Sequence, residues 1–393
     1  MKKILGCVLG LATCAGVAAA QTVELITRQG NAGPVPLSLQ NEARAAIDRG
    51  LRWVEARQQT DGHWSNPDFP ALTALPLWAM ARCVSTNRAA MERARQFLLT
   101  CVHTNGAIYR EPAQQQKGGG LANYNTALCM VALHALNDPQ LTPVILRARA
   151  FVAGTQHLGA DEYRGGMGYD PANERPYADL SNSYLAYEAM RLTQKVEDQR
   201  RAGEKKVDLD WQAAAEFVTR IQHKPSGTNA TPDPEAGGFG YRPGYSMAGT
   251  ATNAAGEVQL RSYGSMTYAG LLSLIYADVD RNDPRVRSAF AWAVKNWTLQ
   301  ENPGMGQEGL YYFYNVVTKA LAATGQTQLT IASGQSLNWR VDMIKKLVGL
   351  QKIEPATGHG YWVNTAGRWW EADPVLVTAY ALLALSIATS GTL

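Results

Sequence analysis

The chain has 393 residues, of which 46% are hydrophobic and 18% charged, and its formal net charge is +4. This composition is typical of a globular protein and excludes a disordered chain, a collagen-like repeat and a small disulfide-stapled scaffold. A net charge so close to zero gives no electrostatic reason to expect nucleic acid as a partner.

Residues 1–20 have the pattern of a secretory signal peptide. Lys2 and Lys3 give a positive start, and the apolar stretch at 4–17 is too short to span a bilayer. Three alanines then end the segment, so we expect cleavage after Ala20 and an N-terminal extension over 21–38. The expected location is periplasmic or extracellular.

Two features bear on how the chain meets a membrane. Cys14 follows Thr13 in what is only a degraded lipobox, so we do not expect a lipoprotein anchored through this cysteine. No later segment is apolar for ~18 residues, so the sequence predicts that the protein is not an integral membrane protein.

Three cysteines follow the expected cleavage site. Cys83 and Cys101 fall at the ends of successive predicted helices, roughly 21 Å apart along the second one. A disulfide needs Cα atoms within about 7 Å. We therefore interpret these two residues and Cys129 as free thiols in the interior.

Six apolar segments recur in one register along the chain. Each starts at an anchor residue, usually Thr or Ser, with a small residue six positions later and Leu or Met directly after it. Segments that are apolar nearly all round are typical of helices buried on every side. The anchors are Thr73, Thr126, Ser183, Thr267, Tyr314 and Thr378.

Six amphipathic segments alternate with the apolar ones and carry charges on one face. They cover residues 41–57, 88–99, 144–154, 211–221, 285–297 and 339–350. A buried ring of six helices inside six half-exposed helices satisfies this alternation with a single core. The sequence therefore predicts an all-α fold, an (α/α)6 toroid of six helical hairpins over 39–390, with a long irregular loop at 224–260.

Most amphipathic segments end in a Gln that precedes a Gly-containing turn and an aromatic residue. Gln58 comes before Gly62 and Trp64, and Gln351 comes before Gly360 and Trp362. Gly permits a positive φ in the turn, and the Gln amide can satisfy backbone groups at the helix end. We interpret these turns as staples between hairpins.

These Gln…Gly-x-Trp/Tyr turns resemble the repeats of squalene–hopene cyclases and of protein prenyltransferase β subunits. The resemblance covers residues 39–390, and residues 237–243 are similar to the glycine-rich segment of the prenyltransferases. Segments 264–270 and 373–380 look especially like those of secreted bacterial proteins that carry prenyltransferase/squalene oxidase repeats. The resemblance implies the terpenoid cyclase-like toroid and a central cavity for an apolar, isoprenoid-like ligand, but no defined reaction.

The chain departs from the catalytic motifs of those enzymes. The prenyltransferases bind zinc through Asp, Cys and His, whereas no Cys follows Cys129 here. The cyclases protonate their substrate with a DxDD motif, and the nearest run here, at 278–284, ends in an Asp-Pro pair typical of a helix start. We therefore expect no metal site and no cofactor.

The inner helices of a toroid all run the same way, so their N-termini converge at one mouth, where partial positive charge favours carboxylates. We place three candidate catalytic acids there: Glu308, Asp373 and Asp179. The last two also fit helix N-cap positions. Asp68 and Glu371 are expected at the same mouth. The candidate ligand-binding residues are Tyr124, Arg261, Tyr263, Tyr311, Trp369 and Trp370. Among them, Arg261 is the expected partner of an ionised Glu308.

The sequence leaves two kinds of function open. The first is an enzyme, a terpene cyclase-like isomerase or lyase or a transferase, that protonates an apolar small molecule in a dry aromatic cavity. The second is a non-catalytic envelope protein that uses the toroid to bind a ligand or a protein partner. An open aromatic pocket favours the first, and a barrel packed solid favours the second.

Overall fold

The computed structural model describes residues 35–111, 120–171, 176–201, 203–224, 233–253 and 256–393. The predicted signal peptide, most of the predicted N-terminal extension and part of the 224–260 loop lie outside these ranges. Within them, no helix is both long enough and apolar enough to cross a membrane.

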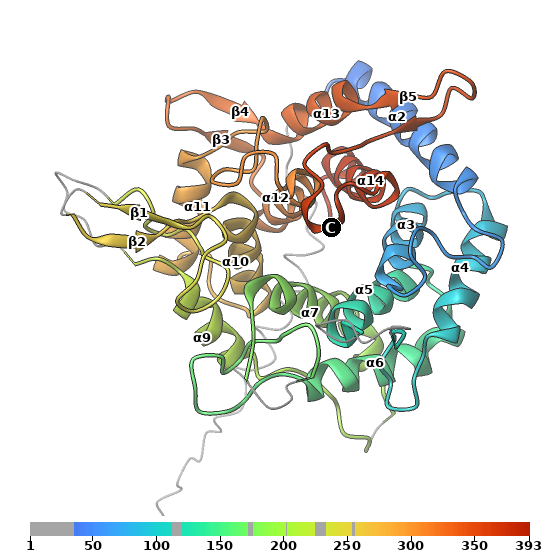
Figure 1. The fold of residues 1–393 in the computed structure, drawn as a ribbon, viewed down its shortest axis with the longest axis horizontal. Helices are drawn as coiled ribbons and strands as arrows, with labels where there is room; N and C mark the ends of the chain where they lie inside the picture. The colour runs from blue at the N-terminus through green and yellow to red at the C-terminus, as the bar shows by residue number, and fades with distance from the viewer. Residues whose placement is uncertain (1–34, 112–119, 172–175, 202, 225–232, 254–255) are drawn as a thin grey trace, which may run out of the picture.

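Six buried helices in the described part of the chain form a closed inner ring (Figure 1). Each packs against the next, and the last packs against the first. The predicted apolar segments all fall in this ring, and the predicted all-α toroid is confirmed. The inner helices are α3 (Ala71–Arg82), α5 (Ala122–Ala135), α7 (Leu180–Leu192), α10 (Gly264–Tyr276), α12 (Leu310–Thr324) and α14 (Pro374–Ser390).

Amphipathic helices surround the ring, and each bears one buried face. They are α2 (Leu37–Ala56), α4 (Arg88–Thr100), α6 (Thr142–Gly154), α9 (Trp211–Ile221), α11 (Pro284–Lys295) and α13 (Trp339–Leu350). Single helical turns add α8 (Gln194–Asp198), η1 (Pro139–Leu141) and η2 (Arg368–Trp370). Side-chain caps begin several outer helices. Asp283, for example, accepts from the Arg285 amide at 2.8 Å, as its Asp-Pro sequence predicts.

In the connections that the structure describes, three short antiparallel hairpins occur that were not predicted. They are too short to show the alternation by which a strand is recognised. One of them, β1–β2, lies within the long loop before α10. The strands are β1 (Thr250–Thr252) with β2 (Val258–Leu260), β3 (Gln328–Thr330) with β4 (Ser336–Asn338), and β5 (Lys352–Ile353) with β6 (Gly360–Tyr361).

The glutamines at the ends of outer helices tie neighbouring outer helices together. The Gln58 side-chain amide donates to the carbonyls of Gly62, at 3.0 Å, and of Ala90 in α4, at 2.8 Å. The Gln351 amide donates to Ala46 in α2 at 2.8 Å, which joins the last outer helix to the first. The staple interpretation is therefore confirmed, and these bonds also close the outer ring.

The anchor hydroxyls have a matching role. The Thr73 hydroxyl accepts from the Trp64 amide at 3.2 Å, and the Thr378 hydroxyl accepts from the Trp362 amide at 3.1 Å. Thr126, Ser183 and Thr267 each accept an amide from the equivalent turn. Each bond satisfies a buried backbone donor, so it fixes the turn onto the inner helix that follows.

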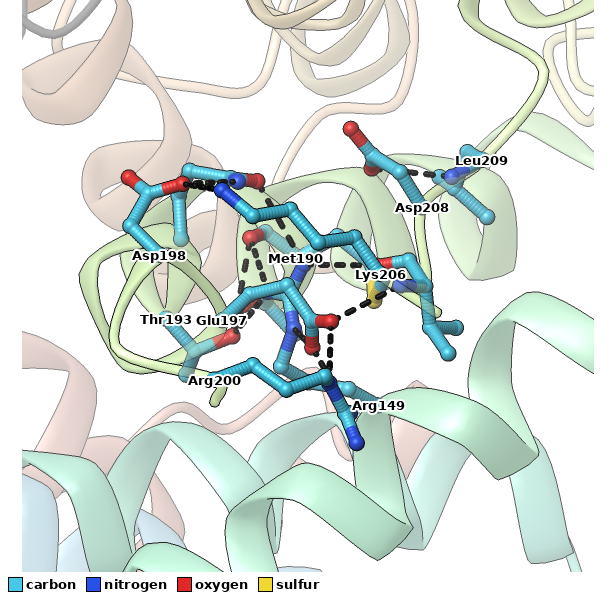
Figure 2. Close-up of polar contacts among 12 residues, drawn as sticks. Arg149, Met190, Thr193, Glu197, Asp198, Arg200, Lys206, Asp208 and Leu209 are labelled. Carbon is cyan, nitrogen blue, oxygen red and sulfur yellow. Dashed lines mark hydrogen bonds and ion pairs between the residues drawn. The ribbon is translucent and has the colours of Figure 1, made fainter. Parts of the chain in front are cut away.

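A buried ion pair holds the segment between α7 and α9 (Figure 2). The Arg149 and Glu197 side chains are fully buried and 3.1 Å apart. Arg149 also donates to the Met190 carbonyl at 2.6 Å, at the end of α7, and Glu197 accepts from the Arg200 guanidinium at 2.7 Å. The bond to Met190 satisfies a backbone carbonyl at the C-terminus of α7, and the bond from Arg200 fixes the connection between α7 and α9. We therefore assign this ion pair a structural role.

The three cysteines in the described ranges are free, as predicted. Cys101 and Cys129 are buried, and Cys83 is half-buried. Burial raises the pKa of the Cys83 thiol to about 12. Thiols held in this way are poor nucleophiles.

Candidate functional site

A pocket of about 350 Å³ lies where the N-terminal turns of the inner helices converge. All six inner helices or their N-caps contribute to its wall, which agrees with the predicted mouth. Its lining residues are Phe69, Ala71, Leu72, Leu75, Leu121, Tyr124, Asn125, Tyr169, Ser181, Tyr241, Tyr263, Ser265, Met266, Gly309, Tyr312, Trp369, Trp370, Glu371, Leu376 and Tyr380.

Aromatic rings form much of the wall. Tyr312 of α12 meets Tyr380 of α14 edge-on, with ring centroids 6.0 Å apart, and Tyr124 of α5 lies 6.1 Å from Tyr169. Burial raises the pKa of Tyr124 to about 12, so its hydroxyl stays protonated at neutral pH. The arrangement is an apolar cavity with a few hydroxyl groups, which suits an apolar ligand that carries little polarity.

Two tryptophans stand at the rim of the pocket. Trp369 and Trp370 are 41% and 51% exposed, and both have positive φ, at 55° and 67°. Trp370 packs edge-on against Phe69 at 5.3 Å, and the Arg368 guanidinium lies 4.5 Å from the centre of the Trp369 ring. Non-glycine residues rarely adopt this backbone conformation, and such strain is concentrated at functional sites.

Glu371 is a carboxyl group in the pocket wall and is only 1% exposed. It accepts from the Tyr312 amide at 2.7 Å, from the Tyr311 amide at 3.3 Å and from the Asn364 side-chain amide at 2.6 Å. It therefore caps the start of α12, whose own N-cap residue, Gly309, has no side chain. Burial raises the pKa of Glu371, and within the described residues it has no cationic partner.

Asp179 is a second buried carboxyl group, one layer behind the wall. It caps α7 by accepting from the Asn182 amide at 2.9 Å. Complete burial raises its pKa to about 6, although hydrogen bonds from Asn182, Tyr177 and Tyr241 oppose that rise. Tyr241 lines the pocket and its hydroxyl is 3.1 Å from that of Tyr169, so a chain of hydroxyl groups leads from this acid to the cavity.

The predicted acids Glu308 and Asp373 do not line the pocket. The Glu308 side chain is 39% exposed and forms an ion pair with Arg368 at 2.6 Å. The prediction of Arg261 as its partner is therefore wrong, because the turn before α14 places Arg368 closer. Asp373 caps α14 by accepting from the Val375 amide at 2.8 Å, as its Asp-Pro sequence indicated.

The predicted ligand-binding residues divide into two groups. Tyr124, Tyr263, Trp369 and Trp370 line the pocket. Arg261 and Tyr311 do not: the first is exposed after β2, and the second is buried on another face of α12, edge-on to Tyr314 at 5.5 Å. For Tyr311 the reason is helical geometry: successive residues of a helix point about 100° apart, and Tyr312 is the residue of α12 that lines the cavity.

Several wall residues were not among the predicted site residues. Tyr380 lies two positions after the anchor Thr378 and Leu75 two after Thr73, and both line the pocket. That shared register could have revealed them. No comparable signal identifies Phe69, Tyr169 or Tyr241, which come from irregular connections.

The described residues contain no group of three or more His, Cys, Asp or Glu side chains that could hold a metal ion. Glu371, the carboxylate in the wall, uses both of its oxygens on amide donors. The polar groups that line the pocket are tyrosine and serine hydroxyls, the Asn125 amide and one carboxyl group, that of Glu371.

Comparison with known proteins identifies the fold. No family model and no curated protein matches the chain. The apo structure of the type II terpene cyclase MstE from Scytonema has a TM-score of 0.54 at 12% identity, covering 90% of this chain and 99% of its own. A variant of MstE in complex with its substrate, geranylgeranyl dihydroxybenzoate, has a TM-score of 0.51 at 12% identity, covering 90% and 98%. The chain thus has a terpenoid cyclase-like α/α toroid.

We expect Asp179 to make the stability of the fold depend on pH. Its pKa is about 6 in the folded chain against an ordinary value of 3.8 for Asp, so the folded state holds the proton more tightly. The stabilisation is complete below pH 3.8 and is lost as the pH rises through 6, a change of about 3 kcal/mol. Urea titrations at pH 4 to 7 should show this loss relative to Asp179→Asn, in which the group cannot ionise.

The Asp179→Asn variant is a suitable reference because Asn182 can still form a hydrogen bond with the side chain at position 179. The Asn182 side-chain oxygen is buried without a partner in the described structure, so a flipped Asn182 amide can accept from the new amide at position 179. Parallel stability curves for the two proteins between pH 4 and 7 would contradict the assignment.

Proposed function

We propose that the central pocket binds an apolar, isoprenoid-like ligand. The observation that carries the proposal is the cavity of about 350 Å³, walled by aromatic and aliphatic side chains at the converging N-termini of all six inner helices. Ligand pockets have volumes of about 300–1,000 Å³ and mainly apolar walls with a few polar groups. The substrate named for the MstE complex, which carries a geranylgeranyl group, supports the same ligand class.

A proton-initiated reaction in the same pocket is a second candidate, favoured by Glu371. A carboxyl group can protonate an alkene only if burial keeps it neutral and aims it at the ligand. Glu371 is in the wall, and its pKa is raised by burial. Asp179 supplies a further proton through the hydroxyls of Tyr241 and Tyr169. This second function depends on the first, because the reaction would occur on a ligand bound in the same pocket.

The proposed setting is periplasmic or extracellular and rests on the sequence of residues 1–20. An apolar ligand would then come from the cell envelope. The pocket rim, formed by Trp369, Trp370 and Phe69, presents apolar rings at the entrance that such a ligand would use.

Mass spectrometry of lipids extracted from protein purified from its native envelope tests the proposal. We expect one prenyl-chain molecule in near-stoichiometric amount, enriched over bulk phospholipid. An extract that contains only the phospholipids of the surrounding membrane would contradict it.

The Glu371→Gln variant separates binding from chemistry. It retains one acceptor oxygen for the Tyr312 amide but cannot donate a carboxyl proton. If the pocket only binds, the variant yields the same molecule as the wild-type protein. If the pocket also protonates its ligand, the variant accumulates an unreacted precursor of equal carbon number.

A further inference from the structure

A second cavity, of about 390 Å³, lies at the C-terminal ends of the inner helices. It shares no lining residue with the pocket described above and contains an arginine among small and hydroxyl-bearing side chains. Its lining residues are Trp78, Ala81, Arg82, Ala135, Ser386, Ser390 and Thr392.

The charges beside this cavity do not balance. The Lys319 ammonium lies 4.4 Å from the centre of the Trp78 ring and is neutralised by Glu188, 2.9 Å away. Arg82 adds a further positive charge, and in the described part of the chain no carboxylate lies within ion-pair distance of it. Burial lowers the pKa of Arg82, and the negative charge of Glu188 opposes that shift. Since Arg remains protonated at any physiological pH, the two cations Arg82 and Lys319 share the single Glu188 carboxylate, and one positive charge is left over.

The hydrogen bonds of Arg82 leave part of its guanidinium free. One terminal nitrogen donates to the Thr392 carbonyl just beyond α14. The Nε atom is buried and has no hydrogen-bond partner among the described residues. Carbonyls at helix C-termini supply only about half an elementary charge, so they offset the guanidinium in part. The buried Nε atom lies out of reach of a ligand, so an oxyanion in the cavity would pair with the terminal nitrogens of the guanidinium instead.

We propose that this cavity binds a small monocarboxylate, with Arg82 pairing to the carboxylate and Trp78, Ala81 and Ala135 contacting its apolar body. Guanidinium and carboxylate match in geometry and charge, and the hydroxyls of Ser386 and Ser390 line the same space. The Glu188–Lys319 pair neutralises Lys319, so the Arg82 charge is the one left for a ligand. The site is independent of the function proposed for the other pocket.

Isothermal titration calorimetry with benzoate, and with benzamide as its uncharged counterpart, tests the proposal. We expect one benzoate per wild-type chain and at least tenfold weaker binding of benzamide. Arg82→Gln should weaken benzoate binding by about 10- to 100-fold, as loss of a charge-assisted hydrogen bond predicts. Arg93→Gln, which alters an arginine on the outer helix α4, is the matched control and should bind as the wild-type protein does.

A second variant tests the site without changing Arg82, in case Arg82→Gln does not fold. Ala135→Phe fills the cavity and leaves Arg82 in place, so it should also abolish benzoate binding while its melting temperature confirms the fold. The proposal is overturned if the wild-type protein shows no saturable benzoate binding, if benzamide binds equally well, or if folded Arg82→Gln retains the wild-type affinity. Displacement by inorganic phosphate at equal affinity would assign the site to oxyanions in general and would also overturn the choice of a carboxylate.

Discussion

Glu188→Gln is expected to lower the free energy of unfolding by about 3–5 kcal/mol, because it leaves the Lys319 ammonium buried without a counter-charge. The two side chains are 2% and 3% exposed, and their charged atoms are 2.9 Å apart. Glu188 also accepts from the hydroxyls of Tyr184 and Tyr276, both at 3.2 Å. Side chains from α7, α10 and α12 therefore meet at this pair in the centre of the inner ring.

Lys319→Met should cost a similar amount, because it leaves the Glu188 carboxylate unpaired. The double variant Glu188→Gln/Lys319→Met removes both charges and keeps an acceptor oxygen for Tyr184 and Tyr276. We expect it to be within about 2 kcal/mol of the wild-type protein.

Urea denaturation at pH 7 measures these differences. The matched control is Lys206→Met, which breaks a pair with Asp198 at 3.4 Å whose side chains are 60% and 53% exposed. Such surface pairs contribute at most about 1 kcal/mol. Additive single-variant losses in the double variant would show that the two buried groups are not coupled and would contradict this account.

The fold could be predicted from the sequence because its repeats carry the physical signals of the fold. The anchors Thr73 and Thr378 accept amides from Trp64 and Trp362, so the recurring hydroxyl marks a bond that each hairpin needs. The same holds for Gln58, whose amide joins α2 to α4. Short hairpins such as β3–β4 depend on local turns and left no periodic signal.

The site could be predicted only in part. The convergence of helix N-termini follows from the repeat and correctly placed Tyr124 and Tyr263 in the wall. Which carboxyl groups are buried depends on how η2 and its flanking turns cross the mouth. There Glu371 turns inward to cap α12, while Glu308 pairs with Arg368 in contact with solvent. Contacts of this kind between distant segments have no signature in sequence spacing.

Filling the pocket should abolish binding of a prenyl ligand without unfolding the chain. Ser181 lines the pocket near the start of α7, and its hydroxyl is 3.4 Å from that of Tyr312. Ser181→Phe places a ring in the cavity and displaces the ligand, so we expect affinity to fall by at least about tenfold, or 1.4 kcal/mol. Ser333→Phe, at an exposed turn, is the matched control and should leave affinity unchanged.

The dissociation constant of geranylgeraniol for the wild-type protein, Ser181→Phe and Ser333→Phe tests the central claim most directly. The account predicts saturable binding of one molecule per chain to the wild-type protein and to Ser333→Phe, and loss of binding in a Ser181→Phe protein that melts like the wild type. Absence of saturable binding to the wild-type protein, or equal affinity in all three proteins, would contradict it.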